Sequence, residues 1–328
     1  MRVLITGATG GLGLALVEKF VFEGFETIAL GRNLKAGEKI KAKGALFIEA
    51  DLNNFDFAKC LKNIDFVIHA AALSSPWGRY KDFFDINVGA TQKLLNASKE
   101  NGVSAFIFIS SPSVYAREKN QIGLIENDAL PEIFMNDYAK TKAMAEQIVK
   151  GENSDNFKTI IIRPRAIIGP NDNVLLPRFL RLIEKGKFPL FNNGNALIEP
   201  SDVRDIANAI HLCAQKYEAI GGEIFNISGG QSMPLKNMIE DIANAMNKEV
   251  KFINLNYELV KPIIGAVENI CKILPNYPEP PLTQYSLCAL SFSQTFDLAK
   301  ARDKLNYSPQ YNAFETAVEI ARNLRGGA

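Results

Sequence analysis

The stretch Thr6-Gly7-Ala8-Thr9-Gly10-Gly11-Leu12-Gly13 decides the fold of this chain. An apolar run at 2–5 precedes it, and a helical pattern of apolar residues follows it over 16–21. This order predicts a strand, a glycine turn and a helix. Gly7 allows the tight turn, Gly10 lets backbone N–H groups approach a pyrophosphate, and Gly13 lets the helix pack closely on the strand. Because a helix N-terminus attracts phosphate, the stretch predicts a bound dinucleotide, although glycines after a strand also form plain turns.

Length and composition limit the possible functions. The 328 residues suffice to bury a full core in one large domain or in two lobes. Lys and Arg number 37 against 36 Asp and Glu, so the formal charge of +1 predicts no general attraction to nucleic acid. A hydrophobic fraction of 47% is typical of a soluble globular protein.

The four cysteines are far apart in the sequence and lack the spacing of a metal site. We therefore predict free thiols, a reducing compartment and no bound metal. The first predicted strand begins at Arg2, which leaves no room for a signal peptide, and no long uncharged apolar run exists. These features predict a cytoplasmic protein.

Apolar strand candidates alternate with helical patterns along the first half of the chain. Near-continuous apolar strands separated by helices indicate a doubly wound parallel α/β sheet of the Rossmann type, with ligands beyond the carboxyl ends of its strands. The predicted strands are 3–6, 27–30, 46–49, 66–69, 105–110 and 159–163.

The regular alternation breaks after Arg163, where prolines and glycines indicate loops. We predict a dinucleotide-binding domain at 1–165 and a smaller substrate-binding lobe at 166–328. Within the lobe, 201–228 is expected to return to the first domain, because the strand-like run at 223–228 can join its sheet. The two parts are therefore predicted to be interleaved.

One later segment has the pattern of an amphipathic helix. Its apolar residues recur at helical spacing over 259–274, with Lys261, Glu268 and Lys272 on the other side. Such a stripe most often faces a core, so we predict a helix that covers the lobe. Insertion of the stripe into a membrane surface is the alternative.

The pair Tyr138 and Lys142 is suited to acid–base chemistry. The reference pKa of tyrosine is about 10, and a nearby ammonium lowers it. Residues four apart on a helix share a face, so both side chains are expected to reach one pocket. Alone, the pair more often marks a solvated helix face. The catalytic interpretation of the pair is supported by Ser111, which follows another buried strand, and by the glycine turn upstream.

This ordered set, spread over nearly the whole chain, resembles the extended short-chain dehydrogenase/reductase family of the NAD-dependent epimerase/dehydratase superfamily. Within it, the chain is most similar to the 3β-hydroxysteroid dehydrogenase-like branch, which includes bacterial 2-alkyl-3-oxoalkanoate reductases. The segments that carry this closer resemblance are 75–78, 162–172, 279–285, 294–297 and 305–309.

The resemblance implies a role for each catalytic candidate. Tyr138 is the general acid or base, and Lys142 lowers its pKa while binding the nicotinamide ribose. Ser111 holds the substrate carbonyl oxygen. Asn87 organises the active-site helix and a proton relay, or it simply bonds to backbone in a kinked helix. His69 is expected to be a structural hydrogen-bonding residue.

The resemblance also implies a cofactor site. Gly31 stands where an acidic residue would bind the ribose hydroxyls of NAD, and Arg32 suits the 2′-phosphate of NADP, so NADP(H) is favoured over NAD(H). Asp51 either contacts adenine or caps the next helix. The expected cofactor-binding residues are Gly7, Thr9, Gly10, Gly11, Leu12, Gly13, Arg32, Asp51, Leu52, Ala70, Ala71, Ala72, Tyr138, Lys142 and Pro164.

The expected substrate is a hydrophobic secondary alcohol or ketone of the 3β-hydroxysteroid or β-oxo acid type. The Asp-Glu pair that nucleotide-sugar dehydratases carry after the catalytic serine is replaced here by Pro112-Ser113. A nucleotide-sugar epimerase and a catalytically idle NADP-binding regulator remain alternatives. Family precedent suggests a homodimer through the helices that carry Asn87 and Tyr138. The expected substrate contacts are Ser75, Trp77, Ser113, Arg165 and Leu176.

Overall fold

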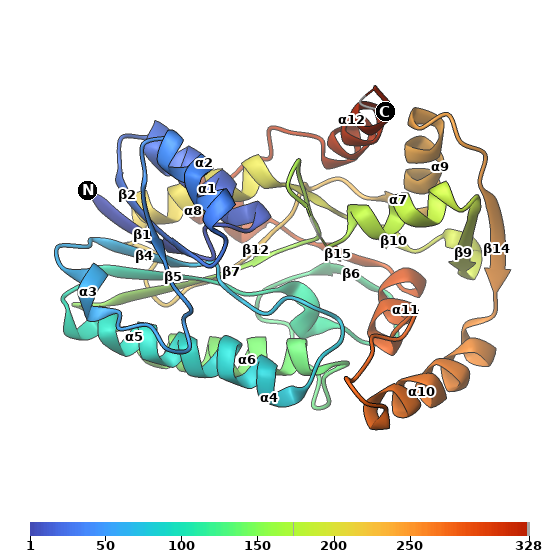
Figure 1. Cartoon of the computed structure of the whole chain (residues 1–328), viewed down its shortest axis with the longest axis horizontal. Coiled ribbons are helices and arrows are strands. Elements are labelled where there is room, and N and C mark those ends of the chain that lie inside the picture. The colour runs from blue at the N-terminus through green and yellow to red at the C-terminus, as the bar shows by residue number, and fades with distance from the viewer. Residues whose placement is uncertain (173, 327–328) are drawn as a thin grey trace.

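A seven-stranded sheet with every neighbouring pair parallel forms the centre of the molecule in the computed structural model, which describes residues 1–172 and 174–326 (Figure 1). Its strand order is β3-β2-β1-β4-β5-β7-β12. This is the doubly wound Rossmann order with one strand added at the edge, and it confirms the predicted fold class. The strands are β1 (Arg2–Thr6), β2 (Glu26–Gly31), β3 (Leu46–Glu49), β4 (Phe66–His69), β5 (Ala105–Ile109), β7 (Lys158–Pro164) and β12 (Ile224–Ile227).

Helices cover both faces of this sheet, and each face has its own apolar core. Both cores are built from apolar strand residues and the buried stripes of the helices, which explains why the strands are apolar throughout. One face carries α1 (Gly11–Phe22), α2 (Leu34–Ala42) and α8 (Val203–Lys216), and the other α3 (Ala58–Leu61), α5 (Thr91–Glu100) and α6 (Asp137–Gly151). A short α4 (Tyr80–Phe84) and a π-helical segment (Asp85–Ala90) lead into α5.

Residues from the second half of the chain return to the sheet. β12 pairs in parallel with β7, and α8 shares the apolar core of α1. The strand expected at 105–110 ends one residue early, at Ile109, although Ser110 N–H still donates to the Ile162 carbonyl at 2.7 Å. The division of the chain at residue 165 stays a prediction.

A smaller lobe lies to the right of the sheet in Figure 1 and has a third apolar core. Its strands form pairs and not a large sheet. The remaining strands are β6 (Gln121–Leu124), β8 (Ile167–Ile168), β9 (Lys187–Phe191), β10 (Leu197–Ile198), β11 (Ser201–Asp202), β13 (Met233–Pro234), β14 (Lys251–Leu255) and β15 (Gln294–Phe296). The remaining helices are α7 (Leu176–Glu184), α9 (Leu235–Ala245), α10 (Tyr257–Ile273), α11 (Gln284–Ser291) and α12 (Ala313–Gly326), with short helical turns at Pro112–Tyr115, Asn192–Gly194 and Ala301–Leu305.

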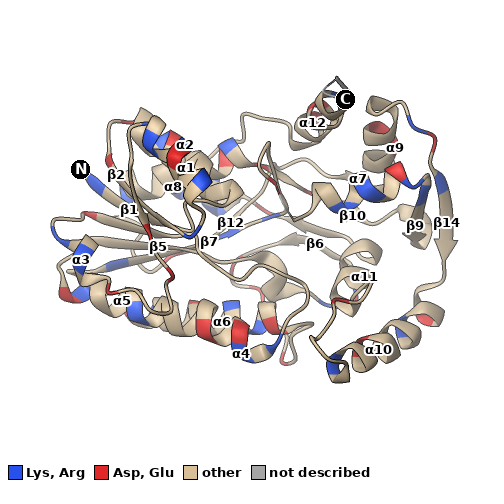
Figure 2. Cartoon of the chain, viewed as in Figure 1, with Lys and Arg blue, Asp and Glu red and all other residues tan. Residues whose placement is uncertain are grey.

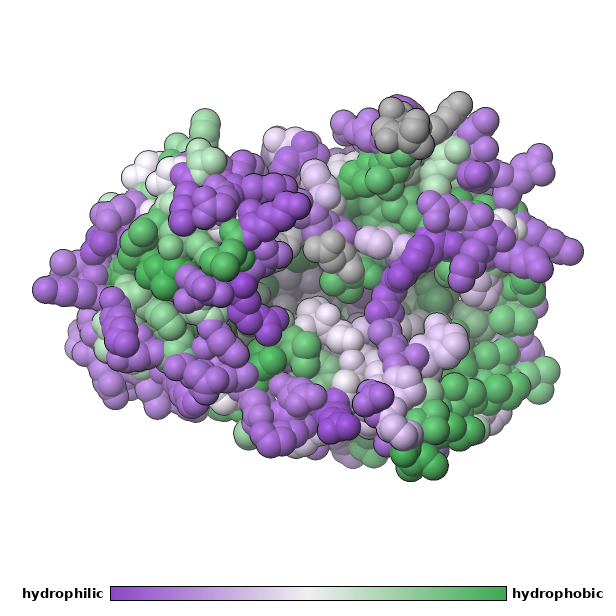
Figure 3. All heavy atoms as spheres, in the orientation of Figure 1, coloured by the Kyte–Doolittle hydropathy of each residue, from purple (hydrophilic) through white to green (hydrophobic). Residues whose placement is uncertain are grey.

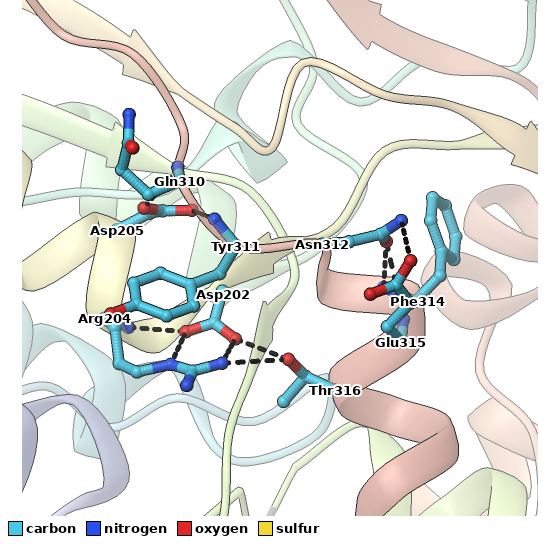
Figure 4. Close-up of polar contacts among 9 residues, drawn as sticks. All are labelled: Asp202, Arg204, Asp205, Gln310, Tyr311, Asn312, Phe314, Glu315 and Thr316. Atoms are coloured by element: carbon cyan, nitrogen blue, oxygen red, sulfur yellow. Dashed lines mark hydrogen bonds and ion pairs between the residues drawn. The ribbon is translucent and has the colours of Figure 1, made fainter.

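A polar cluster joins the C-terminal segment to the start of α8 (Figure 4). The buried carboxylate of Asp202 accepts two hydrogen bonds from the Arg204 guanidinium at 2.8 Å and one from the Thr316 hydroxyl at 2.7 Å. Asp205 accepts from the backbone N–H groups of 310–311 at 2.9 and 3.1 Å. These contacts fix α12 of the lobe against a helix of the main sheet.

Helix α10 confirms the expected amphipathic helix, but its predicted burial is wrong. Leu259, Ile263 and Ile270 are 70%, 62% and 53% exposed, and the surface over α10 is apolar in Figure 3. The buried side instead carries Glu268, which accepts hydrogen bonds from the backbone and side chain of Gln284 at 2.7 and 2.9 Å. A polar residue faces the lobe because α11 supplies it with partners.

The distribution of charged residues agrees with the nearly equal numbers of basic and acidic residues in the sequence. Lys and Arg are interspersed with Asp and Glu along the ribbon in Figure 2. None of the helices in the described ranges is long and apolar enough to cross a membrane. Contact of α10 with a membrane surface stays an untested alternative.

Candidate active site

A cavity of about 1960 Å³ lies between the carboxyl ends of the main strands and the lobe. Figure 3 shows the surface hollowed at this place. Pockets for one small ligand are commonly about 300–1,000 Å³. The volume therefore accommodates a dinucleotide together with a second molecule.

The glycine turn forms one end of this cavity, and each glycine has a distinct steric reason. Gly7 has a φ of +67°, and a Cβ on it would lie 2.7 Å from the Cα of Ala71. A Cβ on Gly13 would lie 2.1 Å from the Gly7 carbonyl oxygen. At Gly10 the nearest atom would be 3.3 Å away, so its cavity side is open to a ligand. These spaces and the N-terminus of α1 fit the pyrophosphate of a dinucleotide.

Gly11 has a role that the sequence did not indicate. A Cβ on it would lie 2.7 Å from the carbonyl oxygen of Asn171, in the loop that follows β8. Asp172 fixes this loop, because its carboxylate accepts the backbone N–H of Leu176 at 2.8 Å, at the start of α7. A segment of the lobe thus touches the glycine turn directly.

The end of β2 carries the residues expected to choose between NAD and NADP. A Cβ on Gly31 would lie 2.5 Å from Cγ2 of Thr9, so close contact disfavours any larger residue there. The exposed Arg32 lines the cavity beside it. Asp51 also lines the cavity and accepts the backbone N–H of Asn53 at 3.1 Å. It does not cap α3, which begins only at residue 58.

Ser111, Tyr138 and Lys142 all line the cavity. Asn136 begins α6 by accepting the backbone N–H of Ala139 at 2.9 Å, which places Tyr138 in the first turn. Ser111 stands at the end of β5, where the chain turns toward the cavity. The structure therefore brings the three side chains together.

The electrostatics of this group differ from the simple expectation. Burial raises the pKa of the Tyr138 phenol, although hydrogen bonding to the hydroxyls of Ser74 and Ser111 opposes the rise. Lys142 Nζ donates to the Ile109 carbonyl at 2.5 Å, and burial lowers its pKa to about 7. The expected lowering of the Tyr138 pKa by Lys142 is therefore not seen in this structure.

Asn87 and His69 are buried and hydrogen-bonded to protein groups. Asn87 Oδ1 accepts the backbone N–H of Leu73 at 2.8 Å, and its Nδ2 donates to Thr141 Oγ1 at 3.2 Å. It lies in the π-helical segment and outside the cavity lining. His69 bonds to Thr6 and Thr91 hydroxyls, and burial lowers its pKa to about 3. A neutral His69 thus joins β1 to the start of α5, while a proton-relay role for Asn87 stays a prediction.

The expected substrate contacts divide into two groups. Ser75, Ser113 and Arg165 line the cavity. Trp77 lies outside the lining and stacks on Tyr277 with 5.0 Å between ring centroids. Leu176 also lies outside it, because its side chain is buried in the core of the lobe.

Two residues that line the cavity were not among the substrate contacts expected from the sequence. Ser74 hydrogen-bonds to Tyr138. The serine pair at 74–75, shortly after the alanines of 70–72, is the sequence feature that could have indicated this residue. Tyr285 also lines the cavity, and it belongs to the segment 279–285 that carried part of the family resemblance. All fifteen expected cofactor-binding residues line the cavity.

Comparison with known proteins agrees with this arrangement, which defines a Rossmann-type enzyme that uses a pyridine nucleotide. The chain belongs to the NAD dependent epimerase/dehydratase family, whose model matches residues 3–228. Relatives named as reductases place it in the extended short-chain branch predicted from its motifs, as an NAD-dependent dehydrogenase or reductase.

Three similar proteins illustrate the range of this family. The uncharacterized protein YbjS of Escherichia coli (strain K12) is 31% identical over 99% of this chain and 98% of its own length. A 2-alkyl-3-oxoalkanoate reductase of Stenotrophomonas maltophilia is 27% identical over 96% of this chain and 97% of its own. The solved structure of MoeE5 with UDP-glucuronic acid and NAD has a TM-score of 0.78 at 22% identity, covering 99% of this chain and 100% of that one. The last similarity is one of fold alone.

Proposed function

We propose that this protein interconverts a secondary alcohol and a ketone on a hydrophobic substrate of the 3β-hydroxysteroid or β-oxo acid type. The observation that carries the proposal is the meeting of Ser111, Tyr138 and Lys142 in one cavity with the glycine turn. A bound nicotinamide supplies hydride to the ketone carbon, or takes it from the alcohol.

The side chains of the protein control the oxygen of the substrate. In the reducing direction, Ser111 donates a hydrogen bond to the carbonyl oxygen as negative charge develops there. Tyr138 delivers a proton to the same oxygen. Lys142 holds a position one helical turn along the same face of α6, from which its ammonium would hold the ribose of a bound nicotinamide and assist the proton supply.

The hydrophobic character of the substrate is inferred from the far end of the cavity. Apolar side chains from α7, α9, α11 and α12 line that end, and a long acyl chain or a flat ring system would bury apolar area against them. These residues are Leu175, Phe179, Leu182, Leu235, Met238, Leu290 and Ile320.

NADP(H) is the proposed cofactor in preference to NAD(H). Arg32 lies exposed at the cavity rim, where a 2′-phosphate could accept its hydrogen bonds. Gly31 provides no carboxylate to compete, and its contact with Thr9 leaves little room for one.

The nucleotide-sugar epimerase remains the alternative in the same family. MoeE5 shares the fold, which by itself does not choose the substrate. Pro112-Ser113 replaces the acidic pair of sugar dehydratases, which disfavours sugar dehydration. Many nucleotide-sugar epimerases carry an asparagine where this chain has Arg163-Pro164-Arg165, and this difference favours the reductase. An idle regulator would need only the cofactor residues, and so the complete set of Ser111, Tyr138 and Lys142 argues against it.

A homodimer is proposed through the helices that carry Asn87 and Tyr138. Tyr80 and Phe84, on the short helix α4 that adjoins α6, are 40% and 36% exposed and offer apolar area for such a contact. Light scattering on the purified protein tests this, and a monomer at micromolar concentration would contradict it.

The function itself is tested with a substrate panel. We expect NADPH oxidation with 3-oxo acids and 3-oxo steroids, and none with UDP-glucose or UDP-glucuronic acid. Longer acyl chains should react better, because each buried methylene contributes about 0.8 kcal/mol until the cavity is full. Turnover of the sugar nucleotides alone would transfer the assignment to the epimerase.

A further inference from the structure

Arg165 occupies a fixed position at the carboxyl edge of the main sheet. Its N–H donates to the Ile227 carbonyl at 2.8 Å, and its carbonyl accepts from the Ser201 hydroxyl at 2.6 Å. The chain then turns at Ala166, which has a φ of +37°. Because hydrogen bonds hold the backbone on both sides, the Cα of Arg165 has a fixed position beside the cavity.

The guanidinium of Arg165 lacks partners within the described part of the chain. Its Nε is buried and has no hydrogen-bond partner, and no ion pair reaches its other nitrogens. Arg163 shows the contrast, since its guanidinium donates to both carboxylate oxygens of Glu146 at 2.8 and 2.5 Å. A buried arginine normally has such a carboxylate.

One carboxylate faces Arg165 without forming an ion pair with it. Glu199 and Arg165 each favour the charged form of the other, but the Glu199 oxygens accept from a serine hydroxyl and a backbone N–H instead, and burial raises the pKa of this carboxyl. Burial also raises the pKa of Tyr285 to about 12 and that of the Cys288 thiol to about 12, which leaves both neutral at neutral pH. Burial lowers the pKa of Arg165, but a guanidinium remains protonated in proteins.

Arg165 shares a cavity with the proposed reaction centre. It lines the same cavity as Ser111 and Tyr138. The phenol of Tyr285 interacts electrostatically with both the Arg165 guanidinium and the Tyr138 phenol. Ser113 adds a second unpartnered donor, because its buried Oγ makes no hydrogen bond and lines the cavity as well.

A carboxylate on the substrate matches this arrangement best. The planar guanidinium donates two parallel hydrogen bonds to a carboxylate, which gives both strength and orientation. Arg178, another arginine that lines the cavity, already pairs with Glu279 at 2.8 Å. In a 3-oxo acid, one carbon separates the carboxylate from the reacting carbonyl, so both groups would lie in the cavity that Arg165 and Tyr138 line together.

We propose that Arg165 is a specificity-determining residue that binds the carboxylate of a 3-oxo or 3-hydroxy acid while Ser111 and Tyr138 act on the neighbouring oxygen. This inference rests on the proposed function and narrows its substrate class from hydrophobic ketones to anionic ones. In reduction, the ketone carbon gains hydride from reduced nicotinamide and its oxygen gains one proton from Tyr138. The product is the 3-hydroxy acid with its carboxylate unchanged, and the oxidised nicotinamide balances the two electrons.

The test compares 3-oxodecanoate with its methyl ester, which keeps the chain and the ketone but removes the charge. The wild-type protein should prefer the acid by at least tenfold in kcat/KM. Arg165→Gln should raise KM for the acid at least tenfold, with a smaller change in kcat and little change for the ester. Arg165→Lys should recover part of the acid preference, because it restores the charge without the planar fork.

Binding measurements separate this proposal from failure of the proposed function. Calorimetric titration with 3-hydroxydecanoate should give a dissociation constant at least tenfold weaker for Arg165→Gln than for the wild-type protein. NADPH binding, followed by fluorescence, should be unchanged by the same substitution. If neither ketone is reduced, the proposed function fails, and the titration still decides whether Arg165 binds the acid.

The matched control is Arg178→Gln, which removes a cavity arginine that already has a carboxylate partner. It should alter the ratio of acid to ester by less than threefold. Thermal unfolding of each variant shows whether it is folded. Equal use of acid and ester by the wild-type protein, or equal loss of both in Arg165→Gln, would overturn the proposal. A loss of NADPH affinity in Arg165→Gln would overturn it too, by assigning the guanidinium to the cofactor.

Discussion

Arg163 and Arg165 stand on either side of Pro164 and meet opposite electrostatic surroundings. Arg163 is buried against Glu146, with Nη2 2.5 Å from the carboxylate and a further bond to the Tyr115 hydroxyl. The Arg165 side chain lines the cavity and has no ion-pair partner among the described residues. One arginine therefore stabilises the fold, and the other is available to a ligand.

The buried ion pair leads to a stability prediction. Arg163→Met should lower the free energy of unfolding by about 3–5 kcal/mol, because Glu146 would remain buried without its partner. Urea denaturation followed by circular dichroism measures the change. The double variant Arg163→Met/Glu146→Leu should recover much of the loss, since no unpaired charge is left behind. An equal or larger loss in the double variant would contradict this explanation.

Lys142 leads to a prediction about pH. Burial lowers its pKa to about 7 from an ordinary value of 10.5, so the unfolded chain binds more protons than the folded protein between these values. The contribution of Lys142 to the free energy of unfolding therefore rises as the pH increases from about 7 to 10.5. Relative to Lys142→Met, the wild-type protein should gain about 2 kcal/mol in unfolding free energy between about pH 7 and pH 9. Parallel stability curves for the two proteins would show that Lys142 is not shifted in this way.

Tyr138→Phe should separate chemistry from binding. Only the phenolic oxygen is removed, so cofactor affinity and folding should stay nearly intact. Turnover should fall by at least about a hundredfold, the lower range for loss of general acid–base assistance. Steady-state kinetics and fluorescence titration with NADPH measure the two quantities. Turnover close to that of the wild-type protein would remove Tyr138 from the mechanism.

Arg32 leads to a prediction about cofactor choice. NADPH should bind at least about tenfold more tightly than NADH, which corresponds to about 1.4 kcal/mol. Arg32→Ala should weaken NADPH selectively in a fluorescence titration of both cofactors. Arg32→Ala is a clearer test than replacing Gly31 with an acidic residue, because any Cβ at Gly31 would lie 2.5 Å from the Thr9 side chain. Equal affinities in the wild-type protein would favour NAD.

The sequence predicted the parts of the fold that local patterns specify. The apolar runs give β1, β4 and β7 nearly to the residue, because a strand covered on both faces must be apolar throughout. The steric reason for Gly13 is likewise visible in the motif, and the helix does pack against the turn.

Long-range packing decided what the sequence could not. The stripe beginning at Leu259 has helical spacing, but α11 covers the opposite side of α10 and supplies partners to Glu268. Trp77 has the appearance of a substrate contact in sequence, yet Tyr277, two hundred residues away, stacks on it. The different surroundings of Arg163 and Arg165 also depend on which helices and loops reach them, which no local pattern contains.

The central claim is that hydride passes between nicotinamide and the carbinol carbon of an acyclic or steroid substrate, with Tyr138 handling the proton. Mass spectrometry of the product formed from 3-oxodecanoate and NADPH carrying deuterium at the nicotinamide C4 tests it directly. We expect one deuterium at C3 of the 3-hydroxydecanoate formed by the wild-type protein, and almost no labelled product from Tyr138→Phe. No labelled hydroxy acid or steroid alcohol from any ketone, together with epimerised UDP-sugar that carries no deuterium, would contradict the account.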